Sequence, residues 1–289
     1  MYLPDFDYYA PATIREACEL LSQFGFRAKV LAGGTDLLPK MKDGLMKPEV
    51  LISLKNLTEL KKIEYLPGKG VVIGALTTHN ELVNSDILNE KYMSISEAAH
   101  QIAANQVRHT GTVGGNLINA VPSADLPPIF IALNASARLA GPQGERTVPL
   151  EELFTGVCLT CTDNTEILTE VFIPDQKMTG STYAKFGLRR SGALAVVGVA
   201  VAVEVEGNVI KDVRICLGAV APTPIRAVQS EEFLKGKTIS DSMLQEAAVI
   251  ASEEAKPISD IRASAEYRKD LVRVFTRRTL RKAIDKGHV

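Results

Sequence analysis

The sequence is poor in residue types on which many kinds of binding site depend. Tryptophan is absent from the 289 residues, so aromatic stacking on a ligand falls to tyrosine and phenylalanine. Lysine and arginine together number 33 against 34 aspartates and glutamates. This balance lacks the basic excess that favours binding to nucleic acid or to an anionic membrane surface. Nucleic acid is therefore not expected as a partner.

Long apolar runs are also missing. No run approaches the roughly 20 apolar residues that span a bilayer. The opening residues, MYLPDFDYYA, lack the charged-then-apolar pattern of a secretion signal. Apolar residues make up 46% of the chain and charged residues 23%, which is ordinary for a globular protein, and the length allows two domains. We therefore expect a cytoplasmic protein with no membrane span.

Cysteine is scarce, and only one pair has a suggestive spacing. The four cysteines include Cys158 and Cys161, separated by two residues. A structural zinc site usually needs a second pair of this kind, and the four histidines also lack ligand spacing. No metal site is predicted. Ordinary reduced thiols are favoured, although a redox role for Cys158 and Cys161 stays open.

Hydrophobic patterns and helix caps predict alternating helices and strands in the first part of the chain. Thr13 and Glu16 have capping-box spacing at the start of a predicted helix over 14–24. The same spacing recurs at Thr78 with Glu81 and at Ser94 with Glu97, the latter before a predicted helix over 95–105. Short apolar runs predict strands over 29–32, 50–54, 71–75 and 166–173, and a hairpin over 136–149.

The pattern changes beyond a short polar stretch at 175–179, which marks a plausible domain boundary. Strands are predicted over 181–186, 194–206 and 209–220, and two helices over 241–254 and 263–286 close the chain. Earlier, Asp125 is placed to cap a helix whose first positions hold Pro127 and Pro128. The fold class predicted from these elements is α+β.

Two glycine pairs give the sequence its most specific signal. One lies in Leu31-Ala-Gly-Gly-Thr-Asp-Leu-Leu38 after a predicted strand, and the other in Thr110-Gly-Thr-Val-Gly-Gly-Asn-Leu117 after a predicted helix. Glycine allows positive φ and removes the Cβ atom that would block a ligand. Successive backbone N–H groups can then converge on an anion such as a diphosphate. We expect both segments to clamp one extended dinucleotide.

Neither segment has the pattern of a common nucleotide site. G-x-G-x-x-G and G-x-x-x-x-G-K-[ST] are both absent, which excludes a standard Rossmann site and a P-loop. Either pair alone could be a tight turn without a ligand. Because threonine or asparagine accompanies each pair, the two together favour a phosphate-bearing cofactor.

The combination of motifs resembles the FAD-binding medium subunit of the molybdenum hydroxylases, the family of aerobic carbon monoxide dehydrogenase and xanthine dehydrogenase. The resemblance covers essentially the whole chain. It rests on the two glycine segments and on flanking motifs. The motifs are Phe6-Asp-Tyr-Tyr-Ala-Pro-Ala-Thr13, Lys40-Met-Lys42, Ile73-Gly-Ala-Leu-Thr-Thr78, Ala120-Val-Pro-Ser-Ala-Asp125, Tyr183-Ala-Lys-Phe186 and Arg189-Arg190.

The resemblance implies a domain organisation. Residues 1–176 would form an FAD-binding domain of the vanillyl-alcohol-oxidase type, with subdomains of about 1–55 and 56–176. Residues 177–289 would form a C-terminal antiparallel sheet backed by helices, as in the carbon monoxide dehydrogenase flavoprotein. The strands and helices predicted after residue 181 agree with this.

The resemblance also implies roles for individual residues, and each has a structural alternative. Lys29 and Lys185 could be surface lysines, Asp125 a helix cap, and Ile102 and Leu168 core residues. The implied roles are as follows: Ala32, Gly33, Gly34, Thr35 and Asp36 at the diphosphate, with Lys29 just before them also at the cofactor; Thr112, Gly115 and Asn116 at the other side of the diphosphate and the ribityl chain; Asp125 at the adenosine; Ile102, Leu168 and Lys185 near the isoalloxazine ring.

By resemblance, the chain is an oxidoreductase subunit that carries FAD and no catalytic acid or base of its own. It would pass electrons from iron–sulfur clusters on a small subunit to a terminal acceptor, while a large subunit holds molybdopterin and hydroxylates the substrate. The assembly would be a dimer of heterotrimers. Two alternatives remain: a free-standing flavin-dependent oxidoreductase of the same superfamily, and a flavin-free assembly subunit.

Overall fold

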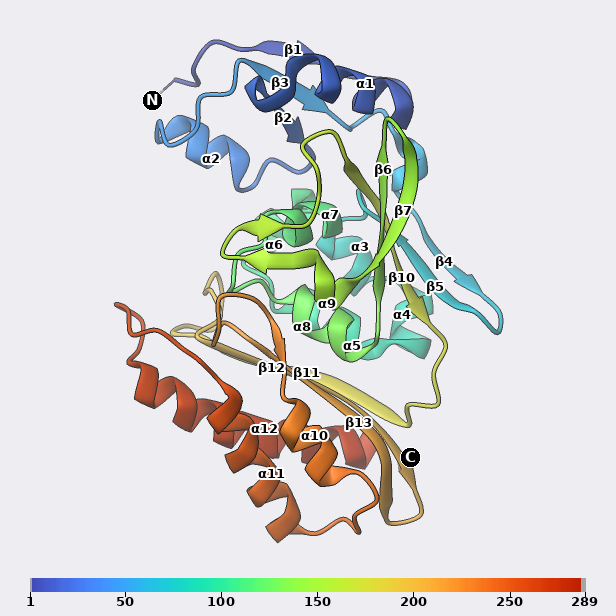
Figure 1. Cartoon of the computed structure of the whole chain (residues 1–289), viewed down its shortest axis with the longest axis vertical. Helices are drawn as coiled ribbons and strands as arrows, with labels where there is room; N and C mark the ends of the chain where they lie inside the picture. The colour runs from blue at the N-terminus through green and yellow to red at the C-terminus, as the bar shows by residue number, and fades with distance from the viewer. Residues whose placement is uncertain (1, 287–289) are drawn as a thin grey trace.

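The structure, a computed structural model, describes residues 2–286, so residues 287–289 of the predicted C-terminal domain lie outside it. Figure 1 shows three tiers stacked along the long axis, with the N-terminal segment at the top and the C-terminal helices at the bottom. Each tier has a sheet of its own, and this mixture of sheets and helices confirms the α+β prediction. No helix in the described part of the chain is both long and apolar enough to cross a bilayer.

The first tier is a small parallel sheet with two helices. Its strand order is β1-β3-β2, built from β1 (Asp7–Tyr9), β2 (Ala28–Leu31) and β3 (Val50–Ser53). Helix α1 (Ile14–Phe24) begins where predicted, because the Thr13 hydroxyl accepts the Glu16 N–H. A single 3-10 turn, Gly25–Arg27, joins α1 to β2, and the short α2 (Leu37–Lys42) follows β2.

The second tier is a five-stranded antiparallel sheet covered by short helices. The strand order is β4-β5-β10-β6-β7, and β10 at its centre pairs with both β5 and β6. The strands are β4 (Ile63–Leu66), β5 (Gly70–Gly74), β6 (Ser136–Gly141), β7 (Gly144–Pro149) and β10 (Ile167–Pro174).

Most of the helices of this tier lie between β5 and β6 in sequence. They are α3 (His79–Val83), α4 (Asp86–Lys91), α5 (Met93–His100), α6 (Asn105–Thr110), α7 (Val113–Ile118) and α8 (Leu126–Ala132). The 3-10 turn Thr58–Leu60 precedes β4. Between β7 and β10 lie α9 (Leu150–Leu153) and a small hairpin of β8 (Phe154–Gly156) and β9 (Leu159–Thr160).

The third tier is an antiparallel sheet of order β11-β12-β13-β14 with three helices. Its elements are β11 (Gly180–Phe186), β12 (Val197–Glu206), β13 (Val209–Gly218), β14 (Ile225–Arg226), α10 (Val228–Leu234), α11 (Asp241–Glu254) and α12 (Ala265–Lys286). Figure 1 shows α10, α11 and α12 on the side of the sheet away from the second tier.

Strand β12 is buried on both faces, and its sequence alternates accordingly. Val197, Val199, Val201 and Val203 pack with the three C-terminal helices, whereas Ala200 and Ala202 belong to the core of the second tier. Successive side chains of a strand point to opposite faces, so the large residues meet the helices and the small ones let α8 approach. The third tier therefore shares a hydrophobic core with the second.

Two helix predictions are wrong in this region. The predicted helix over 95–105 is α5, which starts at Met93 and ends at His100, and Ser94 lies inside it without capping it. The Ser94 hydroxyl is hydrogen-bonded to Ser181 of β11 instead. The segment 110–116, for which no helix was predicted, contains the last residue of α6 and the first residues of α7. Contacts between distant segments override the local signal in both cases.

Candidate functional site

The two glycine segments lie against each other, although they are separated by more than seventy residues in sequence. A Cβ atom built on Gly33 would lie only 1.9 Å from the carbonyl oxygen of Thr110 and 3.1 Å from the Cα of Gly111. Only glycine can occupy this position, because any side chain would collide with backbone. The structure therefore brings the first and second tiers together at the predicted cofactor residues.

The first segment offers a run of free backbone donors. Within the described residues, none of the N–H groups of residues 32–36 donates to a protein acceptor. Gly34 has φ +72°, a conformation that glycine adopts without strain. Consecutive unpaired N–H groups in such a turn form a concave site for an anion. This arrangement matches the diphosphate role predicted for Ala32 to Asp36.

The second segment differs, and the prediction that its glycine amides also converge on the diphosphate is wrong. The N–H of Gly114 donates to the Ala75 carbonyl at 2.8 Å, and the N–H of Gly115 donates to the Thr112 hydroxyl oxygen at 3.1 Å. Gly114 is instead a close-packing residue, since a Cβ there would lie 2.9 Å from the Cβ of Ala75. The glycine pair serves the packing of α7, and its amides are bonded to the Ala75 carbonyl and to the N-cap residue Thr112.

Asn116 is the residue of the second segment that lacks a partner. Its Oδ1 atom is buried and forms no hydrogen bond among the described residues. An unpaired buried acceptor is costly, which makes it a strong indication of a missing ligand group. Thr112 accepts the Gly115 N–H but keeps its own hydroxyl proton to donate.

Among the described residues, the His79 side chain is a second buried group with an unpaired polar atom, and its sequence position just after Thr78 carries no functional signal. Its Nδ1 atom forms no hydrogen bond, and its ring packs against Gly111. Its backbone N–H donates to the Gly111 carbonyl at 3.0 Å. Burial, helped by the nearby charge of Arg108, lowers the pKa of His79 to about 4. The imidazole is therefore neutral at pH 7.

Asp125 and Lys185 form a buried ion pair. The Lys185 ammonium donates to Asp125 Oδ2 at 2.8 Å, and both side chains are 7% exposed. Tyr183 donates to Asp125 Oδ1 at 2.8 Å. Burial raises the pKa of Asp125, while the Lys185 charge and the Tyr183 hydroxyl oppose that rise. The Asp125 side chain therefore makes no capping bond to α8, contrary to the capping prediction.

This ion pair restricts the predicted roles of its two members. Asp125 was expected at the adenosine and Lys185 near the isoalloxazine ring. The two ends of an extended dinucleotide lie far apart, so a single ion pair cannot contact both. Lys185 also donates to the Gln101 carbonyl at 2.9 Å, which places the pair beside Ile102.

The turn that carries Ile102 is fixed by three separate elements. Three successive carbonyls each accept a hydrogen bond from a different element. Lys185 donates to the Gln101 carbonyl, and the Arg108 guanidinium donates to the Ile102 carbonyl at 2.9 Å. The Gly192 N–H donates to the Ala103 carbonyl at 3.0 Å. Ala103 has φ +41°, which is strained for a residue with a side chain and persists only where the surroundings impose it. The position of Ile102 is thus held rigidly.

The remaining predicted residues lie where their structural alternatives suggest. Lys29 is exposed on β2, Thr35 is half-buried and Asp36 is exposed at the start of α2. Ile102 and Leu168 are 7% and 4% exposed, and both belong to the core of the second tier. Burial alone therefore neither supports nor excludes contact with a cofactor for these two residues.

The cysteines are free thiols on separate elements or on the small hairpin. Cys158 is exposed at the turn between β8 and β9, with φ +55°, and Cys161 is half-buried just after β9. Across residues 2–286, no group of three or more histidine, cysteine or acidic side chains is arranged to hold a metal ion.

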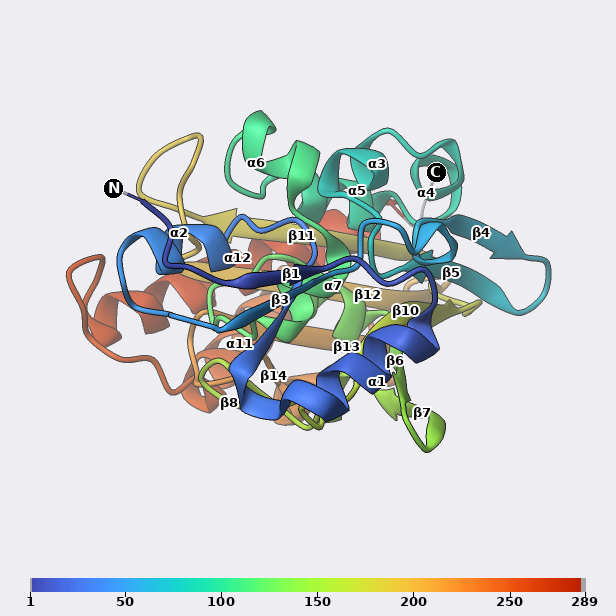
Figure 2. The ribbon, with the colours of Figure 1, turned by 90° about the horizontal axis from the view of Figure 1, so that it is seen from above.

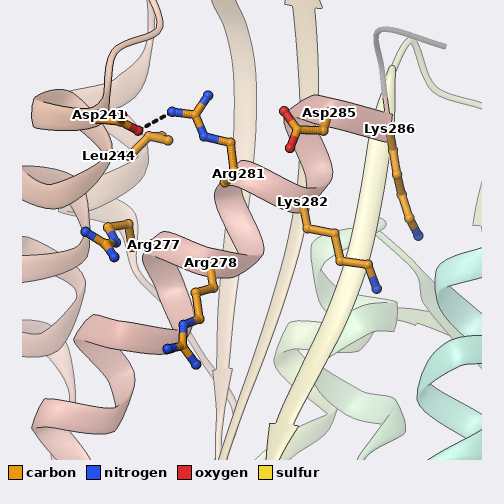
Figure 3. A pocket seen from close by; sticks show the side chains of 8 residues that line it. All are labelled: Asp241, Leu244, Arg277, Arg278, Arg281, Lys282, Asp285 and Lys286. Carbon is orange, nitrogen blue, oxygen red and sulfur yellow. Dashed lines mark hydrogen bonds and ion pairs between the residues drawn. The ribbon is translucent and has the colours of Figure 1, made fainter.

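A groove of about 690 Å³ opens elsewhere, between α11 and α12 (Figure 3). Figure 3 shows basic side chains of α12 along it, and Arg281 pairs with Asp241 of α11. Lys282 and Lys286 both pair with Glu97 of α5. None of the predicted cofactor residues lines this groove, and three of its five basic side chains are held in ion pairs. The free amides and the unpaired Asn116 point to the glycine segments instead.

Two protein families match the sequence in succession. The family described as the FAD binding domain in molybdopterin dehydrogenase matches residues 4–176. The family described as the CO dehydrogenase flavoprotein C-terminal domain matches residues 181–283.

Individual relatives also match this sequence over nearly its whole length. The carbon monoxide dehydrogenase medium chain of Hydrogenophaga pseudoflava is 38% identical over 284 residues, covering 98% of each chain. The glyceraldehyde dehydrogenase medium chain of Sulfolobus acidocaldarius is 33% identical, covering 96% of this chain and 97% of the relative. Among solved structures, a chain of carbon monoxide dehydrogenase from Hydrogenophaga pseudoflava superposes with a TM-score of 0.96 at 37% identity, covering 99% of both chains.

Proposed function

Because this chain belongs to the family of FAD-binding medium subunits of molybdenum hydroxylases, we propose that it binds FAD at the junction of its first two tiers and relays electrons within a multi-subunit oxidoreductase. The observation that carries this proposal is the run of free N–H groups at residues 32–36 beside the unpaired Asn116 side chain. A diphosphate with an adjoining polyhydroxyl chain supplies partners for both.

The residues would share the binding as follows. The amides of Ala32 to Asp36 would hold the diphosphate, and Thr112 and Asn116 would bind the other side of it and the ribityl chain. Gly33 and Gly115 would keep side chains out of the way. Lys29, whose side chain is exposed on β2 just before this run of amides, would contribute positive charge to the cofactor.

We propose that Ile102, Leu168, Lys185 and Asp125 all serve the isoalloxazine end. Asp125 moves to this end because its carboxylate binds Lys185, which in turn binds the turn that carries Ile102. Bound FAD would accept electrons singly and release them in pairs, which suits a junction between one-electron and two-electron carriers. The chain itself would position the ring, bury it and hold a neutralised ion pair next to it.

The partners follow from the proposed relay. We infer an iron–sulfur small subunit and a molybdopterin large subunit, in a cytoplasmic assembly of two heterotrimers. The FAD-binding domain would comprise residues 1–176, with subdomains of about 1–55 and 56–176, and the C-terminal domain residues 177–289. For electron transfer, the flavin edge would lie near the surface that meets the small subunit.

The test is flavin content combined with apoprotein stability. The purified full chain should absorb near 450 nm, a general property of oxidised flavin. Asn116→Ala should lower FAD affinity by about tenfold, because a buried polar contact is lost. The same change should leave the apoprotein at least as stable as the wild type, because it removes an unpaired buried acceptor. Full flavin retention in this variant would place the cofactor elsewhere.

Simple observations distinguish the two rival functions from the proposed one. A free-standing oxidoreductase would turn over a small substrate without partners, whereas the proposed subunit should co-purify with two other polypeptides. A flavin-free assembly subunit would be colourless after purification and would bind no added FAD.

A further inference from the structure

One polar bond connects the two elements that follow the glycine segments. Helix α2 comes directly after the first segment, and Asn119 ends α7, which carries the second glycine pair. The Lys40 ammonium donates to Asn119 Oδ1 at 3.1 Å. Both residues are half-buried. The bond therefore spans the junction of the two tiers on the side of the cofactor residues.

The Lys40–Asn119 bond is isolated. Between residues 2–55 and 56–176 it is the only hydrogen bond that joins two side chains. The other direct approach of the segments is the contact of Gly33 with the Thr110 backbone. That contact sets how closely the segments can approach. Away from the glycine segments, the two tiers are also joined by apolar packing that includes Cys18 and Ile167, and by a hydrogen bond from the Cys18 thiol to the Ala140 carbonyl at 3.4 Å. Beside the segments themselves, the hydrogen bond from the Lys40 ammonium group, which is stronger than one between neutral groups, supplies a local attraction.

The choice of lysine at position 40 is informative because this lysine has no counterion. No carboxylate of the described residues forms an ion pair with its ammonium group, although the side chain is half-buried. Withdrawing an unpaired charge from water is unfavourable unless good donors and acceptors replace the water. Asn119 uses one of the three ammonium donors. Lys40 is thus committed to this bond rather than to a surface ion pair.

We propose that Lys40 and Asn119 form a clamp that holds the two glycine segments at the separation an FAD diphosphate requires. Lys40 is a positioning residue in this role and acts through Asn119. The inference rests on the proposed function, since it assigns to the clamp the retention of the same cofactor. Its signature is that loss of either side chain should have the same effect as loss of both.

The experiment measures FAD affinity and dissociation rate for the full chain by flavin fluorescence. The variants are Lys40→Met, Asn119→Ala, the double variant, and the exchange Lys40→Asn with Asn119→Lys. Lys47→Met is the matched control, because Lys47 is an exposed lysine of the same tier without a recorded partner. Each single variant should weaken FAD binding by about tenfold, mainly through faster dissociation. The double variant should be no weaker, and the exchange should recover part of the loss.

The outcomes separate the clamp from its competitors. Additive losses, or a loss in Lys40→Met with none in Asn119→Ala, would mean that lysine contacts the diphosphate directly, and would overturn the clamp. Unchanged affinity in both single variants would overturn it as well. If the variants lose apoprotein thermal stability but keep wild-type FAD affinity, the bond is merely structural and the inference fails. A wild-type chain that binds no FAD would refute the proposed function itself.

Discussion

The two glycine pairs look alike in sequence and differ in structure. Gly33 and Gly34 lie in an open turn, where the backbone N–H groups of residues 32–36 have no acceptor in the described part of the chain. Gly114 and Gly115 lie in α7, and their N–H groups donate to Ala75 and Thr112. The first pair provides an anion site through its backbone. The second allows α7 to pack closely and its two amides are already bonded, so that the unpaired Asn116 side chain is its clearest offer to a ligand.

This difference separates two reasons for a glycine. One is conformational, as at Gly34 with φ +72°, and the other is steric, as at Gly114 beside Ala75. Gly33 belongs to the steric class in spite of its place in the open turn, because it contacts the backbone of the second segment. Substitutions at these positions should therefore not behave alike.

The largest effect is expected at the contact between the segments. Gly33→Ala places a Cβ 1.9 Å from the Thr110 carbonyl oxygen, so the two tiers must separate locally. We expect a loss of about 4 kcal/mol in the free energy of unfolding, at the upper end for a single change, and no measurable FAD binding. Urea denaturation and flavin content measure the two effects.

Gly44→Ala is the matched control for this variant. Gly44 follows α2 and has φ +73°, but a Cβ there meets no atom within 4 Å. It should cost only the strain of the left-handed backbone, about 1–2 kcal/mol, and should leave FAD bound. Equal losses in both variants would refute the steric interpretation of Gly33.

A smaller effect should appear with pH, and it concerns the second segment. The pKa of His79 is about 4 in the folded protein against an ordinary 6.5. Between these values the unfolded chain binds the extra proton, so stability should rise with pH through this window and fall as the solution is acidified. The difference corresponds to about 3 kcal/mol.

Other groups titrate in the same range, so the comparison must be made between variants. His79→Gln should flatten the dependence of the unfolding free energy between pH 4 and 6.5. His100→Gln, at an exposed histidine, should leave it as in the wild type. If the two variants gave parallel curves, His79 would not be the group responsible.

The smallest effect should distinguish Gly34 of the first pair from Gly115 of the second. Gly34→Ala introduces a side chain at φ +72°, at a cost of about 1–2 kcal/mol. Gly115→Ala lies in α7, where alanine favours the helix by about 1 kcal/mol, and its Cβ would lie 3.0 Å from the Thr112 hydroxyl oxygen. These terms nearly cancel, so Gly115→Ala should be close to neutral in thermal unfolding. A reversed ranking would contradict the assigned roles.

Local signals in the sequence predicted much of the fold. The helices Ile14–Phe24 and Asp241–Glu254 have the predicted bounds, and Thr78 with Glu81 forms the predicted capping box at α3. In these cases the partners of each cap lie within four residues. The mixed α+β architecture and the family were predicted correctly from the combination of motifs.

Errors arose where distant residues decide the outcome. Ser94 and Glu97 have capping-box spacing, but Ser94 bonds Ser181 and Glu97 binds Lys282 and Lys286 of α12. The Asp125 carboxylate binds Lys185 in the same way, from the third tier. Spacing along the chain contains no information about such partners.

The site was predicted unevenly for the same reason. The glycine segments were found from sequence, and their contact is present in the structure. The different bonding of their amides, the buried His79 and the Lys40–Asn119 bond could not be predicted, since each depends on a tertiary neighbour. Whether the predicted residues touch FAD stays a prediction.

Because β12 is buried on both faces, the C-terminal domain cannot be exchanged independently of the second tier. Ala200 and Ala202 pack into the core of the second tier, whereas the alternating valines pack into the core beneath the C-terminal helices. The strand therefore belongs to both cores. A chimaera that joins residues 2–176 to the C-terminal domain of a relative would have to match the alanine face to α8. Side chains larger than alanine at positions 200 and 202 would push the third-tier sheet away from α8. This shift would break the ion pair between Lys185 and Asp125. Exchange of the whole chain between such proteins should therefore leave the fold intact, whereas exchange of the C-terminal domain alone should disrupt it.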